Sequence, residues 1–391
     1  MTTKINNEHK KLNVPNLRFP EFEEEWEELG LSELLDFKNG LNPKPDKFGK
    51  GIKFISVMDI LNNAVITYDC IKASVDVTEK ELSDFSVEKG DILFQRSSET
   101  LEDVGRANVY MDDKTAVFGG FVIRGKKKGE YDPQYFNYLL RSPFARKRII
   151  PMGAGAQHFN IGQEGLSKVK LHFANIEEQK KIGRMLSLLD ERIATQNKII
   201  EDLKKLKSAI SKKLLCNDKW TTCIIQDIAE IGRGRVISSV EIDRQKHPLY
   251  PVYSSQTSNN GIMGYLDNYM FDGEYITWTT DGANAGTVFY RKGKFNCTNV
   301  CGTLKILPKF DCYFVSLVLQ QATQKYVSSN LANPKLMNNT MASIKIRMPN
   351  IETQKQLSKV FQTLDSCLLV HQRTCKMYLS EKQYLLRQMF I

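Results

Sequence analysis

The chain has 391 residues, which is enough for two or more domains with separate hydrophobic cores. Its net charge of +10 favours an acidic partner. No apolar run approaches membrane-spanning length, the polar start MTTKINNEHKK lacks the apolar core of a signal peptide, and eight scattered cysteines are typical of reduced thiols in a cytosolic protein.

The first part of the chain predicts a polar arm followed by a domain that mixes strands and helices. Residues 1–15 are polar and predict a flexible arm, and residues 16–174 predict the domain. Apolar runs bounded by Gly and Asp predict strands at Ile52–Val57, Gly90–Gln95, Ala107–Met111 and Ala116–Ile123, and a helix at Pro133–Arg148.

A long helix is predicted next, at residues 175–216, and a second copy of it closes the chain at residues 350–391. NIEEQKKIGRMLSLLD and NIETQKQLSKVFQTLD are identical at 7 of 16 positions with a constant offset of 175. Asn175 and Asn350 are natural N-caps. Both copies carry a 4-3 apolar spacing, which favours a coiled-coil seam. Two surface helices packed on separate cores are the alternative.

Between the helices, residues 217–349 predict a second domain that repeats the first. Trp26 aligns with Trp220, the strand–loop–strand segment Gly90–Met111 with Gly273–Arg291, and the predicted helix Pro133–Arg148 with Asp311–Val327. The loops hardly match. We therefore predict an α+β protein with two similar domains of mixed or antiparallel strands and two long helices that carry coiled-coil seams. Divergent loops on one scaffold indicate one binding operation performed on two targets.

If the two helices pack antiparallel, the seam also predicts a register for the pair. The expected seam residues are Leu189, Ile193, Gln196, Ile200, Leu203, Lys207, Ile210, Leu214, Leu364, Leu368, His371, Cys375, Tyr378, Lys382, Leu385 and Met389. Only one register places the polar members together, pairing Gln196 with Lys382 and Lys207 with His371, and it sets Leu203 opposite Cys375. Pseudo-twofold duplication further predicts that Pro15–Trp26 lies near Ile391.

This order of segments resembles the DNA-specificity subunit of type I restriction–modification systems. The resemblance rests on LRFPEFEEEWEE, on GLSKVKLHFANIEEQKKI with its twin MASIKIRMPNIETQKQL, and on PVYSSQTSNNGIMGYLDNYMFDGEYITWTTDGANAGTVFY, and it covers nearly the whole chain. It implies two target-recognition domains separated by the two long helices, which pack as an antiparallel, pseudo-twofold coiled coil. It also implies a non-catalytic, cytoplasmic, nucleoid-associated protein whose two domains each read half of a split site in double-stranded DNA. The implied partners are two methyltransferase subunits, which methylate adenine, and restriction/translocase subunits. S-adenosylmethionine, ATP and Mg are expected in those partners, and neither cofactor nor metal in this chain.

Candidate DNA contacts come from polar loops, because Arg and Asn side chains can make paired hydrogen bonds to base edges. They are Arg96, Ser97, Ser98, Thr100, Arg106, Asn108, Gln157, His158 and Asn160 in the first domain, and Ser254, Ser255, Gln256, Thr257, Thr279, Thr280, Asn284, Lys335 and Asn338 in the second. Basic residues that could bind phosphate are Arg124, Lys126, Lys127, Lys128, Arg141, Arg146, Lys147 and Arg148.

Two other functions stay open from the sequence. Asp132–Pro133–Gln134–Tyr135 is similar to the Asp-Pro-Pro-Tyr signature of amino-methyltransferases, so a degenerate adenine methyltransferase is one alternative. The second Pro is missing and no Gly-rich nucleotide loop is present, which favours a helix start with Pro at its first position. A coiled-coil adaptor without a DNA role is the other alternative.

Overall fold

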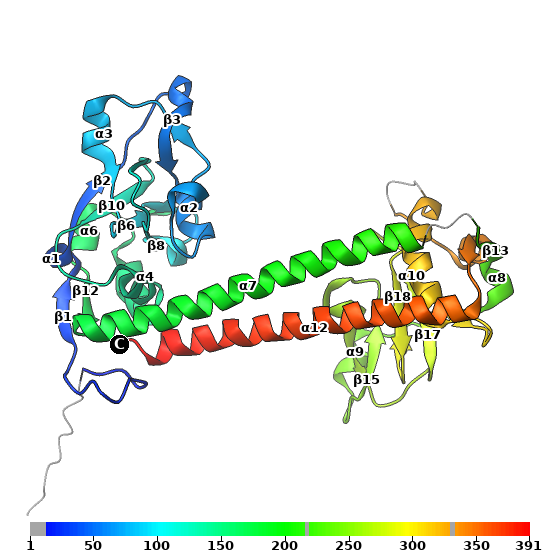
Figure 1. Ribbon diagram of the computed structural model, residues 1–391. Coiled ribbons are helices and arrows are strands. Elements are labelled where there is room, and N and C mark those ends of the chain that lie inside the picture. Colours follow the sequence, from blue (N-terminus) through cyan, green and yellow to red (C-terminus); the bar gives the residue numbers. More distant parts are fainter. Residues whose placement is uncertain (1–12, 216–218, 329–332) are drawn as a thin grey trace, which may run out of the picture. The chain divides into compact units, whose positions relative to one another are not determined.

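The computed structural model describes residues 13–215, 219–328 and 333–391, so most of the predicted arm lies outside the described residues (Figure 1). The chain divides into two compact units. Unit 1 comprises Met1–Asn197 and Arg373–Ile391, and unit 2 comprises Lys198–Gln372. Each unit thus contains one predicted domain and a segment of each long helix.

Unit 1 contains two four-stranded sheets and two short strand pairs. The first sheet has the order β2 (Leu35–Asn39), β10 (Val122–Lys127), β6 (Ile92–Gln95) and β8 (Ala107–Val109). The second has the order β4 (Ser74–Val75), β3 (Phe48–Ile55), β9 (Ala116–Phe118) and β5 (Ser86–Val87). The pairs join β1 (Glu27–Gly30) to β12 (Lys170–Phe173) and β7 (Ser97–Ser98) to β11 (Phe159–Asn160).

The helices of unit 1 are short apart from the long one. They are α1 (Leu31–Leu34), η1 (Pro45–Lys47), α2 (Val57–Asn62), η2 (Tyr68–Cys70), α3 (Glu79–Phe85), η3 (Leu101–Asp103), α4 (Pro133–Arg141), α5 (Pro143–Ile149), η4 (Ile150–Met152), α6 (Gln163–Ser167) and the start of α7 (Ile176–Leu214). The predicted helix Pro133–Arg148 is two helices. Pro143 cannot donate to the helix ladder, and Ser142 ends α4 and caps α5 through the Ala145 amide.

Unit 2 repeats the main sheet of unit 1. Its order is β14 (Ala229–Arg233), β20 (Cys301–Ile306), β17 (Glu274–Thr279) and β18 (Val288–Lys292), which corresponds element by element to β2–β10–β6–β8. A second sheet joins β16 (Ile262–Leu266), β15 (Tyr250–Tyr253) and β19 (Asn296–Cys297), and β13 (Thr221–Ile224) pairs with β21 (Lys345–Met348) as β1 does with β12. This repetition confirms the predicted fold class.

The helices of unit 2 follow the same plan. They are α8 (Ile225–Ile228), α9 (Ser239–Asp243), η5 (Ser258–Gly261), α10 (Cys312–Ala322), η6 (Thr323–Tyr326), α11 (Asn338–Ser343) and the start of α12 (Ile351–Gln388). Each unit has its own core. Trp26, Phe136 and Phe390 are buried in unit 1, and Trp278 and Phe314 in unit 2.

The long helices pack against each other in both units and run antiparallel, with each predicted seam residue buried or half-buried. The predicted register, however, is wrong. Lys382 Nζ lies 2.5 and 2.8 Å from the two oxygens of Asp190 instead of opposite Gln196. Cys375 Sγ lies 3.4 Å from Asn197 Oδ1 instead of opposite Leu203.

Unit 2 shows the same displacement, because Lys207 bonds to Asp365 instead of facing His371. The true register is one heptad away from the predicted one. The predicted register was chosen by pairing polar seam residues only with other polar seam residues. Each lysine instead keeps its aliphatic stem in the seam and extends its ammonium to a carboxylate just outside it. A lysine–carboxylate bond is stronger than the predicted Gln–Lys contact.

The predicted proximity of the start and end of the chain is confirmed within unit 1. The Leu17 amide donates to the Gln388 carbonyl at 2.9 Å, and the rings of Trp26 and Phe390 lie 6.3 Å apart in an edge-on arrangement. Phe19 packs against the same core. The last turn of α12 is thus held by the segment that leads into the first domain.

Candidate nucleic-acid interface

Each long helix is attached to its domain at its N-terminus by a repeated set of hydrogen bonds. Asn175 caps the Glu178 amide at 2.9 Å, and Asn350 caps the Thr353 amide at 2.9 Å. The Gln179 side chain accepts from the Asp132 amide and donates to the Ala174 carbonyl, and Gln354 does the same with Asp311 and Pro349. The long helices therefore fix the orientation of α4 and α10.

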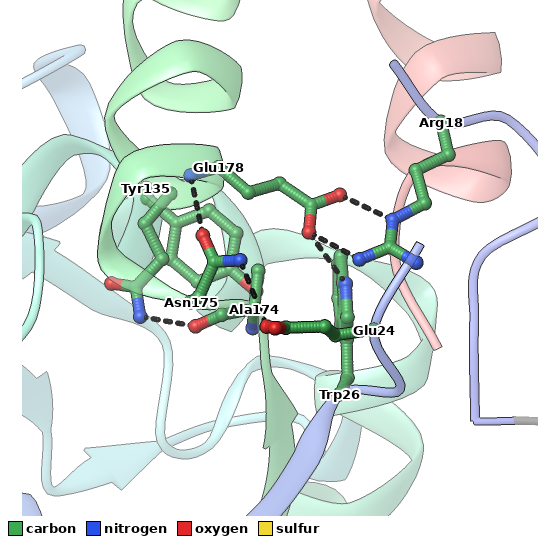
Figure 2. A network of polar contacts seen from close by, with 8 residues as sticks. Arg18, Glu24, Trp26, Tyr135, Ala174, Asn175 and Glu178 are labelled. Atoms are coloured by element: carbon green, nitrogen blue, oxygen red, sulfur yellow. Dashed lines mark hydrogen bonds and ion pairs between the residues drawn. The ribbon is translucent and has the colours of Figure 1, made fainter. Parts of the chain in front are cut away.

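Unit 1 adds a buried charged cluster to this attachment, shown in Figure 2. Glu178 is completely buried and accepts from Arg18 Nε at 2.8 Å, Arg18 Nη2 at 2.7 Å and Trp26 Nε1 at 3.2 Å. The carboxylate raises the pKa of Arg18, chiefly through these hydrogen bonds. The cluster ties the segment before β1 to the start of α7.

A second attachment recurs further along each helix. Tyr138 donates to Asp190 at 2.8 Å and Tyr313 donates to Asp365 at 2.6 Å, and each carboxylate also takes the lysine of the opposite long helix. Burial, with the neighbouring carboxylate, raises the pKa of both phenols. The phenols therefore stay protonated and donate. Since Asp132 caps Tyr135 at 2.8 Å, the Asp132–Tyr135 motif is a helix start in this structure.

In the first domain, two distant predicted loops meet in the β7–β11 ribbon. Ser97 pairs with Asn160 and its hydroxyl donates to the Asn160 side chain at 2.5 Å. Arg96 borders the ribbon, since its carbonyl accepts from Ile161 and its guanidinium donates to Gly120. Ser98, Thr100, Gln157 and His158 continue the same segments; the last three are exposed. The structure thus joins these candidates into one polar surface.

The second domain builds a comparable surface from three segments. The Leu336 amide donates to the Thr280 carbonyl at 2.9 Å, as Ile161 does to Arg96. Asn284 donates to the carbonyl of Ser255, which brings the loop Ser254–Thr257 beside it. Lys335 lies 3.8 Å from Asp281. Residues 329–332 of this region lie outside the described residues.

Three candidates are corrected because their side chains are buried. Asn108 has no exposed surface and donates to the carbonyls of Ile60 and Asn63. Thr279 is 1% exposed, and Thr280 is fully buried with its hydroxyl bonded to Asp281. These side chains are enclosed within the domains and are not offered at their surface. Sequence reasoning grouped them with the polar loops, although Asn108 lies inside a predicted strand, Thr279 ends β17 and Thr280 directly follows it.

Three more candidates make hydrogen bonds or an ion pair within their own domains. Arg106 pairs with Asp103 at 2.5 Å, although its side chain remains half exposed. Gln256 bonds to the Ile262 carbonyl. The side-chain amide of Asn338 donates to the Gly232 carbonyl at 3.4 Å, which ties α11 to β14.

Sequence reasoning missed two residues at these surfaces. Phe121 is 68% exposed at the tip between β9 and β10, and its carbonyl accepts from the Arg96 amide. Arg233 donates to Thr280 at 2.9 Å and to Asp281 at 3.2 Å. The preceding Gly119–Gly120 pair was a usable signal for Phe121, because it marks a turn inside the predicted strand Ala116–Ile123. Nothing in the sequence singled out Arg233.

Other kinds of site are not seen in the described part of the chain. Residues 13–215, 219–328 and 333–391 contain no group of three or more His, Cys, Asp or Glu side chains placed to hold a metal ion. Among the same residues, no helix is both long and apolar enough to cross a membrane.

The chain is similar to proteins of one family. The family model described as the type I restriction modification DNA specificity domain matches residues 23–205 and 217–376, one match for each half of the chain. A Mycoplasma pneumoniae chain named as a type I specificity subunit is 36% identical over 198 residues, covering 50% of this chain and 82% of the relative.

Two further comparisons span nearly the whole chain. A Methanocaldococcus jannaschii chain named as the specificity subunit of type I restriction enzyme MjaX is 23% identical over 406 residues, covering 93% of this chain and 92% of the relative. The crystal structure of the S subunit of an M. genitalium type I restriction–modification system shares the fold, with a TM-score of 0.69 at 18% identity over 97% of this chain and 99% of that one. The repeated domains, the repeated helix attachments and these matches show that the chain belongs to the type I restriction–modification DNA specificity family.

Proposed function

We propose that this chain reads a bipartite sequence in double-stranded DNA and that each domain reads one half of it. The observation that carries the proposal is the repeated scaffold with different polar surfaces. The glutamine and tyrosine bonds that attach α4 and α10 to the long helices are the same in both units, whereas Ser97, Asn160 and Arg96 in one domain correspond to quite different residues in the other. Side chains of these types can distinguish base edges.

The chain itself would be non-catalytic and would direct partner subunits to adenine methylation or to restriction. S-adenosylmethionine, ATP and Mg would belong to two methyltransferase subunits and to restriction/translocase subunits. Exposed apolar side chains on the long helices support docking of such partners. In unit 1 they include Met377, 70% exposed, and Tyr384, 58% exposed; in unit 2 they include Val370, 58% exposed.

The proposal is tested by sequencing the methylated bases of a host that carries partner subunits with and without this chain. We expect adenine methylation at one split motif only when the chain is present. Purified chain alone should neither bind S-adenosylmethionine nor transfer a methyl group. Binding of that cofactor by the pure chain would favour the methyltransferase alternative, and DNA binding that is absent or insensitive to salt would favour the adaptor.

A further inference from the structure

A pocket in unit 1 is lined by three arginines that the attachment of the helices does not use. Its volume is about 440 Å³, and Arg106, Arg141 and Arg146 line it together with Glu102 and an apolar floor that includes Ile60 and Leu140. Pockets of this size hold small ligands. Three guanidinium groups around one space repel each other unless an anion lies among them.

One guanidinium in the pocket has an unused donor. Arg146 Nη2 donates to the carbonyls of Glu102 at 2.9 Å and Val104 at 2.6 Å, while its Nη1 is buried and has no hydrogen-bond partner among the described residues. Burial, and then the nearby charge of Arg106, lowers the pKa of Arg146 to about 10, so the group is still charged near neutral pH. An unpaired buried charged donor is costly, and a ligand oxygen would relieve that cost.

In the second domain, neutral side chains hold the loop that corresponds to Glu102–Gly105. Gly286 and Gly105 occupy equivalent left-handed positions, and in unit 2 the carbonyls of Gly286 and Ala285 accept from Thr323 at 2.7 Å and from Gln324 at 3.4 Å. These neutral side chains donate hydrogen bonds to the loop carbonyls in unit 2, as Arg146 does in unit 1.

The other two arginines also have neutral counterparts. Arg106 corresponds to Thr287, because the Arg106 carbonyl accepts from Gln95 as the Thr287 carbonyl does from Thr279. Arg141 corresponds to Gln320, counted from the N-caps of α4 and α10. The charge of the pocket therefore exceeds what the scaffold requires.

Nearby carboxylates offset only part of this charge. Asp103 pairs with Arg106 at 2.5 Å, but both side chains are partly exposed and the pair can open. Arg141 donates to the Asn63 carbonyl at 3.3 Å and has the carboxylate of Asp190 in its vicinity. Glu102 is the one acidic residue among those that line the pocket.

We propose that this pocket binds a phosphate group, either of the DNA backbone or of a free phosphate compound. The planar fork of a guanidinium matches phosphate oxygens, and two or more forks can hold one phosphate. The apolar floor leaves room for a sugar or base beside it. This site goes beyond the base-reading surfaces. Of its three arginines only Arg106 is also a candidate base contact, so Arg141→Gln and Arg146→Gln test the pocket separately from base reading.

The first arm of the test measures binding of radiolabelled inorganic phosphate to the full chain by equilibrium dialysis at constant ionic strength. We expect one phosphate per chain. The variant R106T/R141Q/R146Q installs the residue types of the second domain, so it should fold with an unchanged circular dichroism spectrum and lose the site. Each single substitution should weaken binding about tenfold, the loss expected for one charged hydrogen bond. The control K44Q/K72Q/K80Q removes the same charge from exposed positions and should bind like the original.

The second arm identifies the source of the phosphate through the salt dependence of duplex DNA binding. If the ligand is a backbone phosphate, the plot of log K against log salt should be less steep for the triple arginine variant than for the lysine control. The difference in slope should be about 0.9 per lost contact. An unchanged slope together with lost phosphate binding identifies a free phosphate compound. The proposal is overturned if the arginine variant equals the lysine control in both arms.

Discussion

Arg18 illustrates how a single residue joins the chain's start to the long helix. Its guanidinium holds the fully buried carboxylate of Glu178, and its own side chain is 12% exposed. Replacing it with Met leaves a buried carboxylate without its cation, which typically costs about 3–5 kcal/mol. We expect Arg18→Met to lower the urea concentration at which peptides of unit 1 lose their protection from hydrogen exchange.

The matched control is Lys180→Met, since Lys180 pairs with Glu177 at 2.7 Å on the same helix but in solvent. Exposed pairs of this kind contribute about 0–1 kcal/mol. Equal effects of the two substitutions would show that the Glu178 cluster has no special role in stability.

Asn160 tests the candidate base-reading surface of the first domain. Asn160→Ala removes an exposed amide that can pair with an adenine edge and should weaken specific binding by about 1–3 kcal/mol at one half-site. Because no phosphate contact is lost, the salt slope should not change. Competition binding with half-site variants measures both quantities. Uniform weakening on every duplex would assign Asn160 to phosphate contact or to folding.

Sequence and structure agree best for residues whose role follows from local geometry. The N-caps Asn175 and Asn350 were predictable because an N-cap depends only on its own helix. Asn108 was misjudged because its burial depends on Ile60 and Asn63, which the sequence does not place beside it. The β7–β11 ribbon was likewise invisible, although both of its segments were already candidates.

At the scale of elements, Gly183 and Ser358 occupy equivalent places on the two long helices. A Cβ on Gly183 would lie 2.7 Å from Asp132 Oδ1 and 2.9 Å from the Tyr135 amide nitrogen. Gly183→Ala should therefore push α4 away from α7 and cost about 1–3 kcal/mol. Thermal unfolding of the full chain measures the loss.

Ser358 provides the comparison, because it donates to Asp311 at 2.5 Å in unit 2. Ser358→Ala removes this bond without a clash and should cost about 0.5–1.5 kcal/mol. The idea that close backbone contact fixes α4 on α7 fails if Gly183→Ala is as stable as the original protein.

The helix register makes another prediction for these elements. The contacts of Lys382 and Cys375 place Cys375 in the layer of Gln196. Under mild oxidation, Gln196→Cys should form a disulfide with Cys375, whereas Leu203→Cys should not, because a disulfide requires Cα atoms within about 7 Å. Non-reducing peptide mapping identifies the bridge. A dominant bridge from position 203 would restore the register expected from the seam.

The seam positions themselves were predictable, because heptad spacing is a property of each helix alone. The register was not, because it depends on which side chains satisfy Lys207 and Lys382. Asp190 and Asp365 lie next to the seam and also hold Tyr138 and Tyr313. These two carboxylates link the helix pair to each domain. The sequence pattern of one helix alone does not predict such a link.

At the scale of the whole chain, the central claim is that the two domains read DNA independently. The duplication could be recognised in the sequence, because the two long helices share residues at a constant offset of 175. The matching sheet orders β2–β10–β6–β8 and β14–β20–β17–β18 show that the domains kept their topology as well. The bases read by each surface cannot follow from topology, because they depend on loop side chains.

The most direct measurement exchanges Trp26–Ala174 for the equivalent block of a relative and sequences the methylated bases in a host that supplies the partner subunits. The account predicts a motif that changes in one half and keeps the other half unchanged. A motif that changes in both halves would contradict independent reading.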